Sequence, residues 1–112
     1  MSFVTVKIDA SGILDWDSFH DVFQKAFGYP PFYGRNMDAW IDCMSDLDDP
    51  STGMTNLHAP AGGVVALEID GAGALMHRCP DQYAAILEGA AFVNWRRMEQ
   101  GEPPVLALSF RK

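Results

Sequence analysis

The first residues of the chain alternate between apolar and polar side chains. In residues 2–8 the apolar residues occupy every second position, which places them on one face of an extended chain. These residues are Val4, Val6 and Ile8. Residues 64–69 form a short apolar run with β-branched members, a pattern typical of a strand that is buried on both faces. A third run, at residues 105–110, closes the chain, so the pattern predicts three strands.

Two helices are predicted between the first and second strands. Asp15 is the expected N-cap of the first helix, and Gly28 is its expected end, because a carboxylate can accept the first free amides and glycine tolerates the left-handed turn. The apolar side chains recur every three or four residues and are Phe19, Val22, Phe23, Ala26 and Phe27. The second helix starts after Asn36 and carries Asp38 in its first turn. Its expected buried stripe consists of Met37, Trp40, Ile41, Met44 and Leu47.

Two more helices are predicted between the second and third strands. Residues 74–79 form a short helix that ends before Pro80, and Asp81 is the expected cap of a long helix that stops at Gly101. The expected buried stripe of the long helix consists of Tyr83, Ile86, Leu87, Ala90, Ala91, Trp95 and Met98.

The order of these elements predicts the fold class. Strands joined through helices run parallel, because the chain must cross back before it can pair again. We therefore expect an α/β fold in which about four helices pack on a mostly parallel three-stranded sheet. The length of 112 residues suits one compact domain over residues 1–112. Residues 48–63 are rich in proline, glycine and small polar residues, which predicts a flexible surface loop.

Composition narrows the possible partners. The net charge of −7 at pH 7 argues against direct binding of nucleic acid, which requires a basic face, and is compatible with a basic protein partner. No apolar run reaches the roughly 18 to 20 residues of a membrane span, and the first residues lack a signal-peptide pattern, so we expect a cytoplasmic protein without membrane contacts. Cys43 and Cys79 have no ligand spacing and are expected to be buried free thiols, with no metal or cofactor.

The second predicted helix carries a stripe of carboxylates. At about 100° per residue, its aspartates fall within roughly an 80° sector, provided that the helix continues as far as Asp49. They are Asp38, Asp42, Asp46 and Asp49. No lysine or arginine lies within residues 36–50. The stripe is either a solvated acidic face or a surface that imitates phosphates for a protein rich in arginine. A calcium site is a third possibility, although the spacing lacks an oxygen-rich loop.

The segment FYGRNMDAWIDCMSDL, at residues 32–47, resembles the characteristic motif of the barstar family. In that motif an aromatic pair, a glycine and an asparagine lead into a helix with aspartates and a cysteine. The matching residues here are Phe32, Tyr33, Gly34, Asn36, Asp38, Ala39, Asp42 and Cys43. The remainder of the chain follows the family more loosely, through the Leu67–Glu68 strand, the long late helix and the closing strand.

The resemblance implies an intracellular inhibitor that plugs the active site of a basic, secreted-type ribonuclease of the barnase kind, in a one-to-one complex. It implies that Asp42 is the principal phosphate mimic, with Asp38 beside it. Tyr33, Gly34 and Asn36 would belong to the loop that lies against the enzyme. The full set of expected partner-binding residues is Phe32, Tyr33, Gly34, Asn36, Asp38, Ile41, Asp42 and Asp46.

The chain also departs from the family pattern. Phe32 stands where the family often has a tyrosine, and Ile41 stands where a tryptophan is common. The late helix offers Asn94, Arg96 or Arg97 in the neighbourhood of the family's additional contacting acid.

Two other functions remain open at this stage. One is an immunity or regulatory module of the barstar fold that binds a different basic toxin or protein. The more distant one is a small carboxylate-dependent hydrolase that uses Asp38, Asp42 or Glu68 together with a histidine. The histidines show no catalytic spacing, however: we expect His20 on the polar face of the first helix, His58 in the loop and His77 on the surface of the short helix. The sequence therefore predicts a protein that is not an enzyme.

Overall fold

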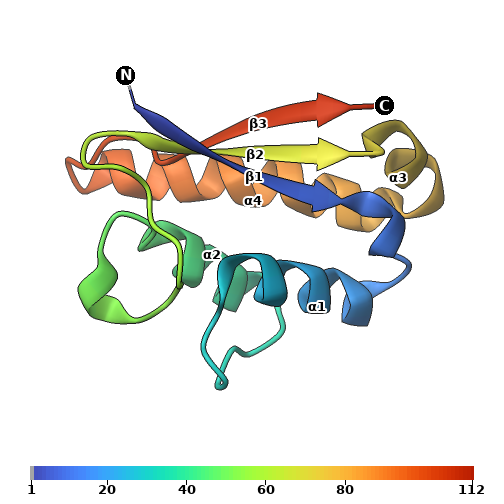
Figure 1. The fold of residues 1–112 in the computed structure, drawn as a ribbon, viewed down its shortest axis with the longest axis horizontal. Helices are drawn as coiled ribbons and strands as arrows, with labels where there is room; N and C mark the ends of the chain where they lie inside the picture. The colour runs from blue at the N-terminus through green and yellow to red at the C-terminus, as the bar shows by residue number, and fades with distance from the viewer. Residues whose placement is uncertain (1) are drawn as a thin grey trace.

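The computed structural model describes residues 2–112 and consists of a three-stranded sheet and four α-helices. The strands are β1 (Phe3–Asp9), β2 (Val64–Asp70) and β3 (Leu106–Arg111), in the order β1-β2-β3. Both strand pairs are parallel, with Val6 opposite Leu67 and Leu67 opposite Leu108. The three arrows of Figure 1 accordingly point the same way. The predicted α/β class, the parallel sheet and the order of elements are confirmed.

The helices are α1 (Trp16–Phe27), α2 (Met37–Ser45), α3 (Ala72–Arg78) and α4 (Pro80–Glu99), with short 3-10 turns at Ala10–Gly12 and Pro50–Thr52. Figure 1 shows α1, α2 and α4 on one side of the sheet. This arrangement explains why β2 is buried on a single face, contrary to the expectation of two: Val65, Leu67 and Ile69 are fully buried, whereas the residues between them keep part of their surface.

Local signals place α1 where it was predicted. The Asp15 carboxylate accepts a hydrogen bond of 2.8 Å from the amide of Ser18, and the Ser18 hydroxyl closes the capping box. At the other end, Gly28 has a φ of 67°, in the left-handed region. A side chain at Gly28 would also collide with Asn56, so both the turn and the packing require glycine there. The face of α1 toward the sheet buries Phe19, Phe23 and Phe27 completely.

Two predicted helix boundaries are wrong, and α3 covers Ala72–Arg78 where residues 74–79 were predicted. α2 ends at Ser45, and Asp46 is its C-cap, so Asp49 does not lie on the helix and the predicted stripe of four is shorter. Asp81 is not the cap of α4, which begins with Pro80 after Cys79 and has no side-chain cap. Proline suits the first helical position because its missing N–H would have had no partner there.

The buried face of α4 also differs from the predicted stripe. Leu87, Ala91, Trp95 and Met98 are exposed. The residues that face inward are Gln82, Ile86, Gly89, Ala90, Val93 and Arg97. Apolar residues occur on more than one side of this helix, so periodicity alone does not select the inner side. Packing against α2 selects it: a Cβ on Gly89 would lie 2.8 Å from Trp40, which only a glycine avoids.

The segment 48–63 is the predicted loop, and two backbone hydrogen bonds help to fasten it to the rest of the molecule. The amide of Asn56 donates to the carbonyl of Phe27 at 2.8 Å, and the amide of Ala59 donates to the carbonyl of Leu47 at 2.8 Å. Thr55, next to the first of these attachments, is buried. The flexibility of this segment concerns dynamics and stays a prediction.

Candidate functional site

The site is built around α2 and the turn that leads into it. The side chain of Asn36 accepts a hydrogen bond of 2.8 Å from the amide of Ala39 and donates one of 3.3 Å to the carbonyl of Gly34. Asn36 therefore caps the helix, as predicted, and also holds the turn before it. A Cβ on Gly34 would come within 3.3 Å of the Asn36 side chain, so a small residue favours this close turn.

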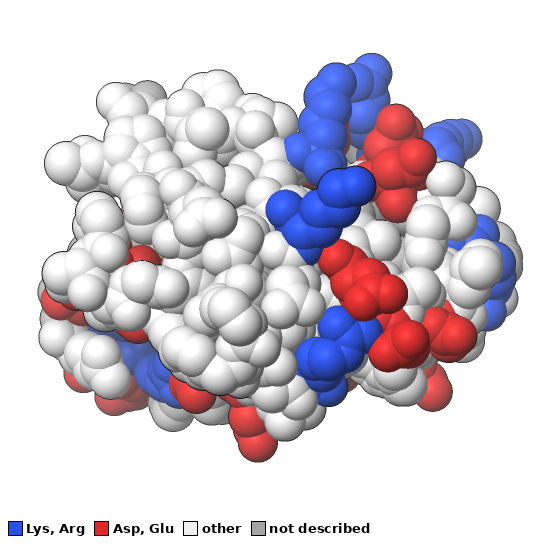
Figure 2. Space-filling model, turned by 60° about the horizontal axis from the view of Figure 1, so that its bottom comes forward, with Lys and Arg blue, Asp and Glu red and all other residues white. Residues whose placement is uncertain are grey.

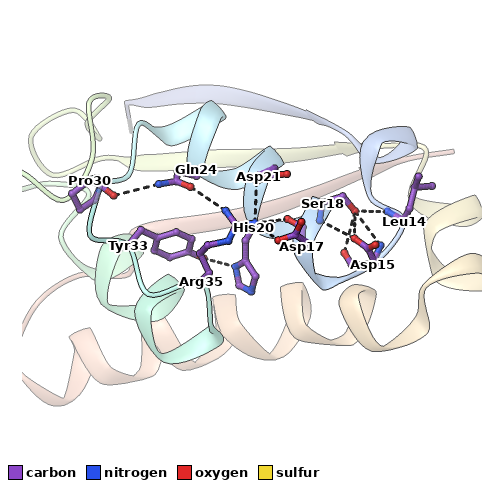
Figure 3. A network of polar contacts seen from close by, with 10 residues as sticks. All are labelled: Leu14, Asp15, Asp17, Ser18, His20, Asp21, Gln24, Pro30, Tyr33 and Arg35. Carbon is purple, nitrogen blue, oxygen red and sulfur yellow. Dashed lines mark hydrogen bonds and ion pairs between the residues drawn. The ribbon is translucent and has the colours of Figure 1, made fainter.

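Arg35 clamps the turn onto α1. Its φ is 53°, a left-handed conformation that is uncommon for residues other than glycine. One guanidinium nitrogen donates to the carboxylate and the carbonyl of Asp17 at 2.7 and 2.8 Å and also lies 2.9 Å from Asp21. A second nitrogen donates to Gln24 at 3.2 Å. Figure 3 shows this set of contacts, which compensates for the unfavourable backbone conformation and fixes the position where α2 starts.

Tyr33 lies inside the molecule rather than on the predicted contact surface. Its side chain is only 6% exposed, and its hydroxyl shares a hydrogen bond of 2.6 Å with Nδ1 of His20. The prediction that His20 lies on the polar face of α1 is therefore wrong, because this pairing satisfies the ring in a buried position. Burial, assisted by the Arg35 charge, lowers the pKa of His20, and burial raises the pKa of Tyr33. Both shifts favour the neutral form, and the pair supports the turn from beneath.

The rest of the predicted turn surface is open. Phe32 is 77% exposed, and Gly34 and Asn36 are exposed as well. Of the two other histidines, His58 lies in the loop and His77 is exposed on α3, as expected.

The acidic face of α2 consists of Asp38 and Asp42, with Asp46 at the helix end. Asp38 and Asp42 are exposed, and Asp46 is half-buried. Burial raises the pKa of Asp46, and the neighbouring Asp49 and Asp42 add to the rise. Asp49 uses its carboxylate to accept a 3.1 Å hydrogen bond from the amide of Ser51 and so caps the turn at Pro50–Thr52. Three of the four predicted carboxylates thus lie on α2 and its C-cap, and Asp49 lies beyond the helix, near Asp46.

A basic residue of α4 reaches this acidic face. Nη2 of Arg96 donates to Asp42 at 3.0 Å and to the hydroxyl of Ser45 at 2.9 Å. From the sequence, Arg96 is expected only in the general neighbourhood of the family's additional contacting acid. No local signal reveals the pair, because its members are separated by 54 residues and meet only where α2 and α4 cross.

Arg97 joins the ends of α2 and α4 from within. Its side chain is 6% exposed and forms a two-pronged pair with Asp48, at 3.0 and 2.8 Å. It also donates to the carbonyls of Ser45 and Pro103, each at 2.8 Å. The Arg97 guanidinium lowers the pKa of Asp48. This bonding holds the C-terminal end of α2 in place just as Asn36 holds its start.

Apolar side chains lie beside the charged ones. Ile41 is half-buried and lines a shallow groove between α2 and α4 together with Met37 and Phe92. Phe92 and Trp95 are exposed with ring centroids 5.5 Å apart. Figure 2, in which the bottom of Figure 1 comes forward, shows an uncharged area next to acidic and basic side chains that lie side by side.

Other chemistries find little support in the part of the chain that the structure describes. Residues 2–112 contain no group of three or more side chains suited to hold a metal ion. No helix among them has the length and apolarity to cross a membrane. Cys43 and Cys79 are free and buried, as predicted, and burial together with Asp42 and Asp46 raises the pKa of Cys43 to about 11. Its thiol is therefore protonated and unreactive near neutral pH.

The fold and the site define a small α/β protein with an acidic helix that is held at both ends and exposes Asp38 and Asp42. The family model described as "Barstar (barnase inhibitor)" matches residues 3–108, and the chain belongs to this family. Membership confirms the resemblance seen in residues 32–47, and it implies a binding role of the barnase-inhibitor kind rather than an enzymatic one. A comparison with curated proteins found no significant match.

Proposed function

We propose that this protein inhibits a basic, barnase-like ribonuclease inside the cell, in a one-to-one complex, by covering the active site of the enzyme with α2. Asp42 and Asp38 take the places of RNA phosphates and accept hydrogen bonds from basic side chains of the enzyme. Phe32, Gly34 and Asn36 form the exposed part of the contact turn, and Ile41 and Asp46 extend the contact along the helix. Tyr33 acts from beneath, by supporting the turn.

The observation that carries the proposal is the exposure of Asp38 and Asp42 on a helix that is held at both ends. Asn36 fixes the start of α2 through the Ala39 amide, and Arg97 fixes its end through the carbonyl of Ser45. A carboxylate suits the fork of an arginine guanidinium as a phosphate does. Because the helix is already ordered, little conformational entropy is lost when a partner binds.

Titration of the purified protein into barnase, while RNA cleavage is followed, tests the proposal. We expect cleavage to stop at one equivalent, and calorimetry at two salt concentrations to show weaker binding at high salt. Asp42→Ala should raise the dissociation constant at least about 30-fold, because loss of one partner of a desolvated charge pair costs roughly 2 to 5 kcal/mol.

Asp70→Ala is the matched control, since it removes the same charge from an exposed position at the end of β2. Equal inhibition by the Asp42→Ala variant and the unchanged protein would show that α2 is not the inhibitory face.

The second candidate is a binding module for a basic protein that is not a ribonuclease. The observation in its favour is the pairing of Asp42 with Arg96. This pairing gives the face a mixed charge, which resembles a row of RNA phosphates less closely than a purely acidic face would. Such a module would leave RNA cleavage by barnase unaffected at every ratio, and this outcome separates it from the inhibitor.

A further inference from the structure

Asp42, the residue expected to bind the partner most directly, already has a cation beside it in the free protein. Arg96 donates to its carboxylate at 3.0 Å. The Arg96 side chain is 34% exposed and that of Asp42 is 58% exposed, so both groups lie at the surface that a partner would cover.

Two hydrogen bonds hold the Arg96 side chain in place. One nitrogen of its guanidinium bonds both to Asp42 and to the hydroxyl of Ser45. That hydroxyl in turn donates to the carbonyl of Ile41 at 2.6 Å, which leaves its oxygen free to accept from Arg96. The next residue along α4, Arg97, is anchored by its own bonds to Asp48 and Pro103. The cation therefore sits on the acidic face at a defined place.

Attachment of α2 to α4 does not require this contact. Arg97 already binds the carbonyl of Ser45 from a buried position, and Trp40 packs directly against Gly89. An ion pair between exposed side chains changes a folding equilibrium by less than about fivefold. The placement of Arg96 therefore affects mainly the binding of a partner to the acidic face of α2.

We propose that Arg96 is a specificity-determining residue of the binding face. It discriminates against partners whose contact surface is wholly cationic, and it favours a ribonuclease that offers a carboxylate next to the basic group that takes Asp42. The proposal rests on the function proposed above and specifies its partner.

The physical reason is the change in surroundings when a complex forms. In the free protein, Arg96 and Asp42 are hydrated and their pairing contributes little. Once a partner excludes water, a basic group that takes Asp42 would lie close to Arg96, and like charges in a desolvated interface disfavour association. A carboxylate on the partner would give Arg96 a new acceptor and remove this penalty.

The experiment measures barnase binding by the unchanged protein and by Arg96→Ala and Arg96→Glu variants, through association kinetics at two salt concentrations. Barnase serves as the basic probe. Arg96→Ala should lower the dissociation constant several-fold, and Arg96→Glu by about tenfold or more, with much of the gain in the association rate at low salt. Arg111→Ala and Arg111→Glu are the matched controls, because Arg111 is an exposed arginine on β3 that lies 3.5 Å from Glu68. They account for the change in net charge.

Unchanged or weaker binding by both Arg96 variants, in a protein that does bind barnase, would overturn the inference and leave the proposed function standing. Failure of the proposed function gives a different result. In that case neither the unchanged protein nor any variant would bind barnase, and the inference about Arg96 would be overturned together with the proposed function. Urea unfolding of the Arg96→Ala variant supplies the structural readout. A change in the unfolding equilibrium constant below about fivefold is expected, and a much larger change would make Arg96 a structural residue instead.

Discussion

Replacement of Arg97 by methionine tests the way in which the binding helix is held. Methionine preserves much of the apolar stem of Arg97 but removes the guanidinium that bonds to Asp48, Ser45 and Pro103. The carbonyls then lose a charged donor, and Asp48 loses its counter-ion. Separation of a buried ion pair costs about 3 to 5 kcal/mol when the remaining charge stays buried.

The structure reduces that figure. Asp48 keeps 31% of its side-chain surface and can be hydrated after the substitution, whereas the side chain of Arg97 is 6% exposed. We therefore expect the free energy of unfolding to fall by about 2 to 4 kcal/mol near pH 7. Arg111→Met, at an exposed arginine whose side chain is 61% accessible, should cost less than about 1 kcal/mol.

The effect of Arg97→Met should depend on pH. The Arg97 charge holds the pKa of Asp48 below its ordinary value in the folded protein. The stability that Asp48 contributes is therefore complete above its unfolded pKa of about 3.9 and is lost as the pH falls through the lowered folded value. The stability difference between the unchanged protein and the variant should shrink over that acidic range.

Urea unfolding, followed by far-UV circular dichroism at pH 7 and at pH 3 or below, measures both effects. A loss below about 1 kcal/mol at pH 7 would contradict the inferred role of the buried guanidinium. A loss that stays the same in acid would show that Asp48 is not the important partner, and would leave the bonds to the two carbonyls as the explanation.

Three further predictions concern the turn before α2 and the end of α1. His20, whose pKa is lowered by burial, should make the protein less stable as the pH falls from about 6.5 through the lowered folded pKa, and His20→Gln should abolish that part of the pH profile measured by thermal unfolding. Tyr33→Phe should lower the free energy of unfolding by about 1 to 2 kcal/mol in urea, because Nδ1 of His20 loses its buried partner, and an unchanged midpoint would argue against that hydrogen bond. Gly28→Ala should cost more than about 1 kcal/mol in urea, since φ is 67° and the new methyl group meets Asn56, whereas a stabilised variant would show that the turn tolerates a side chain.

Phe32 offers a direct test of the contact turn. It is 77% exposed, so Phe32→Tyr should change the free energy of unfolding by less than about 0.5 kcal/mol. The added hydroxyl should strengthen binding to barnase, measured by calorimetry, if Phe32 occupies the position at which the family often has a tyrosine. Unaltered affinity in a variant that does inhibit barnase would place Phe32 outside the interface.

Much of the fold was predictable because its signals are local. The cap at Asp15, the left-handed end at Gly28 and the cap at Asn36 each depend on residues within a few positions of one another, and all three occur as predicted. The alternation in β1 and the order of strands and helices were likewise sufficient for the parallel sheet. The motif at residues 32–47 identified the family that the match over residues 3–108 shows.

The tertiary structure alone decided which side chains of these elements meet. Helix α4 has apolar residues on several sides, and its inner face was selected by the fit of Trp40 against Gly89. His20 is buried because Tyr33 supplies a partner for its ring, and Arg96 reaches Asp42 because α2 crosses α4. Local spacing determines secondary structure through hydrogen bonds over a few residues, whereas these contacts join residues 13 and 54 positions apart. They depend on how the elements pack, and no periodicity along the chain encodes that arrangement.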